Sequence, residues 1–268
     1  MKKTWLIITG LLAVTVGFWV LHKPAVPPGD SIRPLKIGVT AGPHARIIEQ
    51  VQIEAKKRGL ELEIVEFNDF ILPNEALNQG DIDINSYQHQ PFLDEQLKVH
   101  GYNIKSIAKT VLMPMGLYSQ FLKSVRDIPE GAVIGIPNDP TNAGRALLFL
   151  SQLGLIRLKP GMNPTLMDII GNPKNLKIKE LEAPTLVMIL PDVTAAVINT
   201  DWVVLAKIDP RSALAIESTD TPYTNVIAVR TEHEQNEDIK KFVNIYQSDM
   251  VKQFILQTFR GAVIPGWE

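Results

Sequence analysis

Three ring-bearing side chains fall close together in residues 83–92, DINSYQHQPF, where Tyr87, His89 and Phe92 alternate with amides and a proline. A metal site would need converging ligands, but the other histidines are scattered, with no H-x-x-H or HExxH pairing. A catalytic site with His89 as acid or base would need a nucleophile, and no G-x-S-x-G motif is present. Two interpretations remain. Either the three rings line a binding pocket for an apolar or sulfur-containing side chain, or they pack over the end of a strand.

A second string, IPNDPTNAGRAL at residues 136–147, predicts a helix capped by Asn138 or Asp139, with Pro140 in its first turn and Arg145 further along. Free backbone N–H groups and the helix dipole favour an anion at such an end, and a guanidinium matches a carboxylate. The string therefore suits the carboxylate of an amino acid. It equally suits an ordinary capped helix whose arginine is exposed or salt-bridged.

Asn199 and Asn225 stand at the ends of two expected strands, residues 195–199 and 225–230. An asparagine side chain can accept from an ammonium group and donate to a carboxylate, so a pair of them suits a zwitterion. Asparagine is also a common turn residue, and these residues alone do not decide between the two roles.

The elements that must position these side chains alternate between strand and helix from Leu35 onward. The expected order is strand 35–40, helix 44–59, strand 61–67, helix 71–80 and strand 81–85. This alternation predicts an α/β fold with a largely parallel sheet, whose ligand sites lie at the carboxyl ends of the strands. The loops after Thr40, Phe67 and Asn85 should therefore meet at one edge.

A second α/β block follows, with strand 131–137, helix 139–154, strand 176–183 and strand 194–200. Strand 225–230 should return to the first block. The last segment, 237–261, is expected to pack one helical stripe into the core, made of Ile239, Phe242, Tyr246, Met250 and Phe254. Two lobes joined by two chain crossings form a cleft, a favoured place for a ligand.

The expected division has three parts. Residues 1–34 form an N-terminal signal or anchor segment with a tether, residues 35–115 plus 228–268 form lobe 1, and residues 116–227 form lobe 2. Residues 4–21 carry no charge and follow Lys2 and Lys3, which favours an uncleaved anchor with the rest of the chain outside the inner membrane. Cleavage near Ala25 is the alternative.

Composition narrows the classes of function. The 268 residues are 45% hydrophobic, which is ample for a core, and the net charge of -2 gives no basic surface for nucleic acid. The chain has no cysteine, which excludes disulfides, thiolate catalysis and Cys-ligated metal. We expect neither a cofactor nor a metal.

Together these strings resemble the methionine-binding lipoproteins of bacterial ABC importers. The resemblance rests on FNDFILPNEALNQGDIDINSYQHQPFLDEQL, on GIPNDPTNAGRALLFL and on the region from AAVINT to NVIAV, and it runs from about Lys36 to Trp267. It implies a two-lobed type II periplasmic binding protein fold that closes on its ligand.

The resemblance also implies roles for seven residues. Aromatic rings would surround the thioether chain, Arg145 would pair with the ligand carboxylate, and two amides would fix the amino and carboxyl groups. The implied ligand-binding residues are Phe70, Tyr87, His89, Phe92, Arg145, Asn199 and Asn225.

Three features depart from the family pattern. The lipidated cysteine is missing, so a membrane-spanning anchor would replace the acyl chains. Phe70 and Tyr87 stand where the family more commonly has Tyr and Phe. The segments around Asn199, LVMILPDVT before the strand and TDWVVLAK after it, are also less typical.

The expected function is that of an extracytoplasmic binding protein, not an enzyme. It would capture L-methionine or a related small amino acid as a monomer and deliver it to an ABC permease with its ATPase. The alternatives are a binding protein for a dipeptide or another apolar amino acid, an amino-acid-acting enzyme with His89 as base, and a sensor that does not transport.

Overall fold

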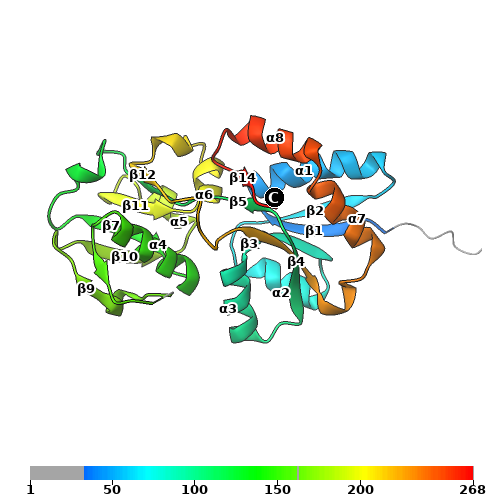
Figure 1. The fold of residues 1–268 in the computed structure, drawn as a ribbon, viewed down its shortest axis with the longest axis horizontal. Helices are drawn as coiled ribbons and strands as arrows, with labels where there is room; N and C mark the ends of the chain where they lie inside the picture. Colours follow the sequence, from blue (N-terminus) through cyan, green and yellow to red (C-terminus); the bar gives the residue numbers. More distant parts are fainter. Residues whose placement is uncertain (1–32, 162, 268) are drawn as a thin grey trace, which may run out of the picture. The chain divides into compact units, whose positions relative to one another are not determined.

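A computed structural model describes residues 33–161 and 163–267, which form two five-stranded sheets with helices packed on them (Figure 1). The expected anchor, residues 4–21, lies outside the described residues, as does nearly all of the tether at 24–34. Within the described ranges, no helix is both long and apolar enough to cross a bilayer.

The first sheet has the strand order β2-β1-β3-β13-β4, in which β1, β2 and β3 are parallel and β13 is antiparallel to both of its neighbours. Its strands are β1 (Leu35–Thr40), β2 (Leu62–Phe67), β3 (Ile84–His89), β4 (Ile104–Lys109) and β13 (Asn225–Arg230). Because β1, β2 and β3 run the same way, the loops after Thr40 and Phe67 lie at one edge together with the end of β3. That end is His89, where α3 begins directly, and not the expected loop after Asn85.

Helices cover both faces of this sheet. One face carries α1 (Pro43–Lys57), α7 (Glu237–Tyr246) and α8 (Asp249–Phe259), and the other carries α2 (Leu72–Gln79) and α3 (Gln90–His100). The apolar residues of α1 recur at helical spacing, and Ile47, Ile48 and Val51 are fully buried against the sheet. A short pair, β5 (Val111–Leu112) and β14 (Ile264–Pro265), lies beside it.

Strand β3 is unusual because its sequence, INSYQH, is mostly polar and yet all six residues are buried. Its amides are satisfied from α2: Asn74 donates to Gln88 at 2.7 Å and accepts from Asn85 at 2.9 Å and from Gln88 at 2.6 Å. The expected bounds of this strand, 81–85, are therefore wrong, since β3 begins at Ile84 and ends at His89. The expectation followed the hydrophobic residues, whereas the buried polar residues of β3 are stabilised by side-chain hydrogen bonds.

The second sheet has the strand order β10-β7-β11-β6-β12. Its strands are β6 (Gly116–Tyr118), β7 (Val133–Pro137), β10 (Lys177–Leu181), β11 (Ala195–Ile198) and β12 (Ala215–Ile216). Helix α4 (Pro140–Gln152) packs on one face, and α5 (Thr185–Met188) and α6 (Thr200–Leu205) pack on the other. A small hairpin-like pair, β8 (Arg157–Leu158) and β9 (Ile169–Gly171), lies nearby.

The chain passes between the two sheets twice, through residues 113–115 and again through residues 217–224. The expected boundary between 227 and 228 falls inside β13. Since the whole of β13 pairs within the first sheet, the second crossing ends before Asn225.

The C-terminal stripe is only partly a core stripe. Ile239, Phe242 and Tyr246 are buried, but Met250 is 49% exposed and Phe254 is half-buried. The chain leaves the helix at Gln247 and starts α8 at Asp249, so the angular register of α7 is not carried into α8. The expectation that Met250 packs in the core is wrong for this reason.

Candidate functional site

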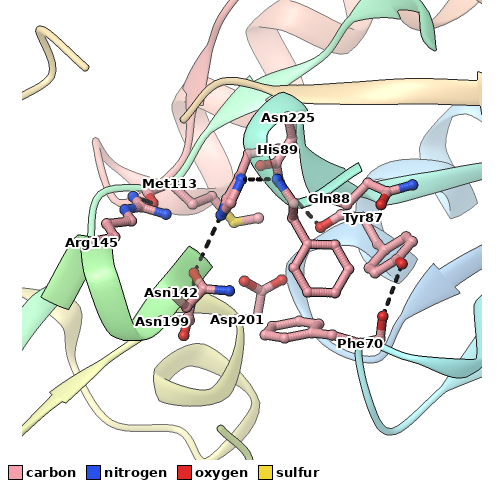
Figure 2. Close-up of a pocket in the computed structure, with 11 residues that line it drawn as sticks. Phe70, Tyr87, Gln88, His89, Met113, Asn142, Arg145, Asn199, Asp201 and Asn225 are labelled. Carbon is pink, nitrogen blue, oxygen red and sulfur yellow. Dashed lines mark hydrogen bonds between the residues drawn. The ribbon is translucent and has the colours of Figure 1, made fainter. Parts of the chain in front are cut away.

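One pocket lies between the carboxyl edge of the first sheet and the second sheet with its helix α4 (Figure 2). The structure brings to its walls all seven residues singled out from the sequence: Phe70, Tyr87, His89, Phe92, Arg145, Asn199 and Asn225. Four further residues complete the lining, namely Gln88, Met113, Asn142 and Asp201.

Aromatic rings form one side of the pocket. The ring centroids of Phe70, Tyr87 and Phe92 lie 6.2 Å from one another in all three pairs. Tyr87 donates its hydroxyl hydrogen to the Phe70 backbone oxygen at 2.9 Å, which holds the loop that carries Phe70. The ring of Phe70 also packs at 5.2 Å against Trp202 of α6. These faces are suited to an apolar or thioether chain.

His89 ends β3 and caps α3. Its Nδ1 accepts a hydrogen bond from the Phe92 backbone N–H at 3.1 Å, so in the neutral ring the proton sits on Nε2, which faces Asn142 Oδ1 at 3.3 Å. Burial, with Arg145 nearby, lowers the pKa of His89 to about 3. Both ring nitrogens are therefore used structurally, and the strand-end role considered for this string is present together with the aromatic wall.

Arg145 is buried and held by both chain crossings. Its Nε and Nη2 donate to the carboxylate of Glu217 at 3.0 and 2.5 Å, and Nη2 also donates to the Met113 backbone oxygen at 3.0 Å. The guanidinium lies 4.3 Å from the ring centroid of Tyr223. The helix cap is as expected, since Asp139 accepts from the Asn142 N–H at 2.9 Å. The salt-bridged alternative is thus also correct. Nη1 has no hydrogen-bond partner within residues 33–161 and 163–267.

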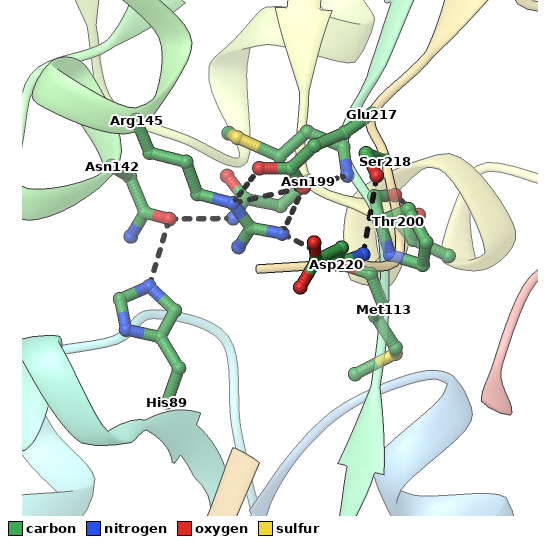
Figure 3. A network of polar contacts seen from close by, with 11 residues as sticks. His89, Met113, Asn142, Arg145, Asn199, Thr200, Glu217, Ser218 and Asp220 are labelled. Atoms are coloured by element: carbon green, nitrogen blue, oxygen red, sulfur yellow. Dashed lines mark hydrogen bonds and ion pairs between the residues drawn. The ribbon is translucent and has the colours of Figure 1, made fainter. Parts of the chain in front are cut away.

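Asn142 links the polar groups of the pocket (Figure 3). Its Oδ1 accepts from His89 Nε2 and from Asn199 Nδ2 at 2.9 Å, and its Nδ2 donates to Asp139 at 3.0 Å. Because Asn199 uses its N–H group in this way, its Oδ1 is left buried without a partner in the described chain. A buried acceptor of this kind requires a donor, and a ligand can supply it.

Asn225 and Asp201 lie around His44 at the start of α1. Asn225 Nδ2 donates to His44 Nε2 at 3.0 Å and to the Tyr87 backbone oxygen at 3.3 Å. Asp201 Oδ1 lies 3.4 Å from the same His44 nitrogen. Burial lowers the pKa of His44 to about 3 and raises that of Asp201 to about 7, so between these two pH values both groups are mainly uncharged.

The buried histidines predict an acid-sensitive fold. Between pH 6.5 and 3 the unfolded chain binds a proton on His89 that the folded chain does not, so the free energy of unfolding should fall as the pH falls through this window. His89→Asn can still cap α3 but cannot titrate. Urea unfolding at pH 7 and pH 4.5 should therefore show that the free energy of unfolding falls less in this variant than in the wild type.

Between pH 4 and 7 Asp201 has the opposite effect on the free energy of unfolding. Because its pKa is raised, the folded chain retains a proton on Asp201 that the unfolded chain releases. It is present in both proteins and therefore does not affect the comparison. His100→Asn, at the exposed end of α3, serves as the matched control and should follow the wild type. A pH-dependent loss in His89→Asn equal to that of the wild type would contradict this role for His89.

Several residues at the site were not expected from the sequence. Asn142 could have been found, because it lies three positions before Arg145 and hence on the same helix face. Glu217 and Met113 lie in the two crossings, where no periodicity marks them. Asp201 lies in TDWVVLAK, and nothing in that string indicates that its carboxylate lines a pocket.

Comparison with known proteins places the chain in a family. A family model described as NlpA lipoprotein matches residues 35–267. The protein from Salmonella typhi called D-methionine-binding lipoprotein MetQ is 45% identical over 239 residues, which cover 87% of this chain and 88% of the relative.

Two solved structures extend the similarity to the fold. A nutrient binding protein from Burkholderia cenocepacia bound to methionine is 46% identical, with a TM-score of 0.84 over 87% of this chain and 99% of that one. A periplasmic substrate-binding protein of an ABC transporter from Coxiella burnetii is 40% identical, with a TM-score of 0.84 over 87% and 100%. The expected fold class is confirmed over the described residues. The chain belongs to the NlpA lipoprotein family.

Proposed function

We propose that the protein captures methionine in this pocket outside the inner membrane and delivers it, unchanged, to the permease of an ABC importer driven by its ATPase. The observation that carries the proposal is the pairing, in one pocket, of an aromatic wall with a cation and an unpartnered amide oxygen. The names of the relatives support the choice of ligand.

The groups match the parts of an amino acid. Arg145 keeps Nη1 for the ligand carboxylate while Glu217 and Met113 fix the rest of its guanidinium. Asn199 Oδ1 accepts from the ligand ammonium. The rings of Phe70, Tyr87 and Phe92 enclose the thioether side chain. His89 caps α3, which carries Phe92, and Asn225 donates to the backbone oxygen of Tyr87.

Two kinds of interaction contribute to the binding free energy of methionine. Burying a methionine-sized side chain contributes about 1.5–3 kcal/mol, and each charge-assisted hydrogen bond contributes about 1.5–3 kcal/mol. These gross terms must also offset the ordering of two lobes and of the ligand. We expect a dissociation constant of about 1 μM, near -8 kcal/mol, which is towards the upper end of what these terms supply.

The two crossings support a closing motion. We propose that residues 35–115 with the C-terminal segment from Asn225 move as one lobe and residues 116–224 as the other, with Arg145 held at the crossings during closure. The protein is proposed to act as a monomer, tethered by its N-terminal segment. A binding role also fits the state of His89, whose ring nitrogens are both occupied, so it is poorly suited to act as a catalytic base.

One observation favours a second ligand class. A larger groove, partly lined by Glu217, Ser218 and Tyr223, shares Arg145 with the pocket. A dipeptide could place one residue in the pocket and its second residue in this groove.

Calorimetric titration of the refolded full-length chain, stripped of carried ligand, distinguishes these ligands. The expected result is one-to-one binding of L-methionine, with weaker binding of leucine, phenylalanine and methionine-containing dipeptides. If a dipeptide bound more tightly than L-methionine, the dipeptide would be the ligand of this pocket. If the folded protein bound none of these compounds, the proposal would be wrong. Recovery of unchanged methionine after long incubation separates binding from enzymatic turnover.

A further inference from the structure

Asp201 is a buried carboxylic acid that lines the pocket, and none of the ligand contacts proposed above involves it. It lies in the first turn of α6, two residues after Asn199, and is 5% exposed. Figure 2 shows its carboxyl group between the Asn142 amide and the ring of Phe70, facing the space where the ligand would lie.

Only one of its two oxygens is engaged by neighbouring side chains. Oδ1 accepts from the Thr40 hydroxyl at 3.3 Å and lies 3.4 Å from His44 Nε2. Oδ2 accepts no hydrogen bond from any other residue within 33–161 and 163–267. An oxygen without a donor in a pocket wall is a site for a donor from the ligand.

The charges of the pocket point to a cationic donor. The charge of Arg145 is already balanced by Glu217, at 2.5 Å. An ionised Asp201 is then an uncompensated negative charge, and a positive group on the ligand would stabilise it. An α-amino acid carries one such group, its ammonium. The other unpartnered acceptor, Asn199 Oδ1, belongs to the same turn of chain.

We propose that Asp201 binds the ammonium group of the ligand through Oδ2, with Asn199 Oδ1 as the second acceptor. Asp201 thereby makes the site specific for ligands with a free α-amino group. The inference rests on the proposed function, since it assumes an amino acid in this pocket. It adds a charged specificity residue to the site.

A purely structural role is the alternative. Asp201 links α6 to β1 through Thr40 and to α1 through His44. Gly42, with φ of 100°, allows the close approach, because a Cβ there would lie 3.3 Å from the Asp201 backbone oxygen. A residue that only joined these elements would affect all ligands of the pocket equally. A residue that binds the ammonium would affect only ligands that carry one.

The test is a two-by-two calorimetric comparison of the wild type and Asp201→Asn, each titrated with L-methionine and with its des-amino analogue, a methylthio-substituted butanoate. Loss of one charge-assisted bond predicts that the substitution weakens methionine binding about 10- to 100-fold, while binding of the analogue is unchanged or tighter. Thr40→Val removes the contact to Oδ1 but keeps the carboxyl group, so it should keep the wild-type preference for methionine within about twofold.

Proton release on ligand binding provides a second measurement, which uses the wild-type protein alone. Burial raises the pKa of Asp201 to about 7, and a ligand ammonium beside its carboxyl group would lower it. Wild-type titrations at pH 7 in two buffers of different ionisation enthalpy should therefore show net release of protons with methionine and none with the analogue. The other ionisable groups around Asp201 are His44 of α1, Tyr87 and His89 of β3, Arg145 of α4, and Glu217.

These groups do not produce the same signal. The pKa values of both histidines lie near 3, and that of Tyr87 is raised far above the range measured. An equal loss for both ligands in Asp201→Asn, or no proton release with methionine, would overturn the inference and leave the proposed function standing. A wild type that binds neither ligand would remove the proposed function and this inference with it.

Discussion

Arg145→Ala should abolish measurable methionine binding and also lower the free energy of unfolding by about 3–5 kcal/mol, the usual cost of breaking a buried ion pair. The substitution removes the cation that faces the ligand carboxylate. It also leaves Glu217 buried, where the Met115 N–H, at 3.1 Å, would be its one remaining donor among residues 33–161 and 163–267. Calorimetric titration measures the first effect and urea unfolding at pH 7 measures the second.

A matched double variant separates binding from folding. Arg145→Ala combined with Glu217→Gln removes both charges, so part of the lost stability should return while methionine binding stays absent. Glu217→Gln alone should keep some binding, because it leaves the cation in place. Retained methionine affinity in Arg145→Ala would contradict the role assigned to its guanidinium. A double variant as unstable as Arg145→Ala would show that the buried charge of Glu217 is not the cause.

Phe70→Ala should weaken methionine binding about 10- to 150-fold, which corresponds to the roughly 1.5–3 kcal/mol that burial against this ring contributes. Phe70 is half-buried and stands on the loop between β2 and α2, so its loss should disturb the core less than loss of the fully packed Phe92. Its contact with Trp202, at 5.2 Å, also joins the two sides of the pocket, so closure should be less stable as well.

Tyr87→Phe is the conservative control for this wall. It keeps the ring but loses the hydroxyl that donates to the Phe70 backbone oxygen, so methionine affinity should fall by about tenfold or less. Competitive displacement of a labelled methionine measures both variants on one scale. If Phe70→Ala bound as tightly as the wild type, the aromatic side of the pocket would not be the place of the thioether chain.

Much of the fold could be predicted from local pattern. Helix α1 was expected because Ile47, Ile48 and Val51 recur at the helical period, and α4 because Asp139 and Pro140 form a recognisable helix start. Strand β3 could not be placed in the same way. Its buried polar residues are satisfied by Asn74 of another element, a tertiary arrangement that leaves no periodic signal.

In the candidate site, too, residues in local sequence patterns could be predicted and residues placed by tertiary contacts could not. Arg145, Tyr87, His89 and Phe92 stand in strings with a local physical meaning, and Asn199 and Asn225 stand at the ends of expected strands. Phe70 comes from the resemblance alone. Glu217 escaped prediction because it lies 72 residues from Arg145 in a crossing segment without secondary structure. Asp201 escaped because only folding brings α6 against the start of α1.

The most direct test of the central claim is a crystal structure grown with selenomethionine as the added ligand and collected at the selenium absorption edge. The account predicts one strong anomalous peak between the rings of Phe70, Tyr87 and Phe92, with the ligand carboxylate on Arg145. A peak in the outer groove, or no ligand peak in crystals of folded protein, would contradict it.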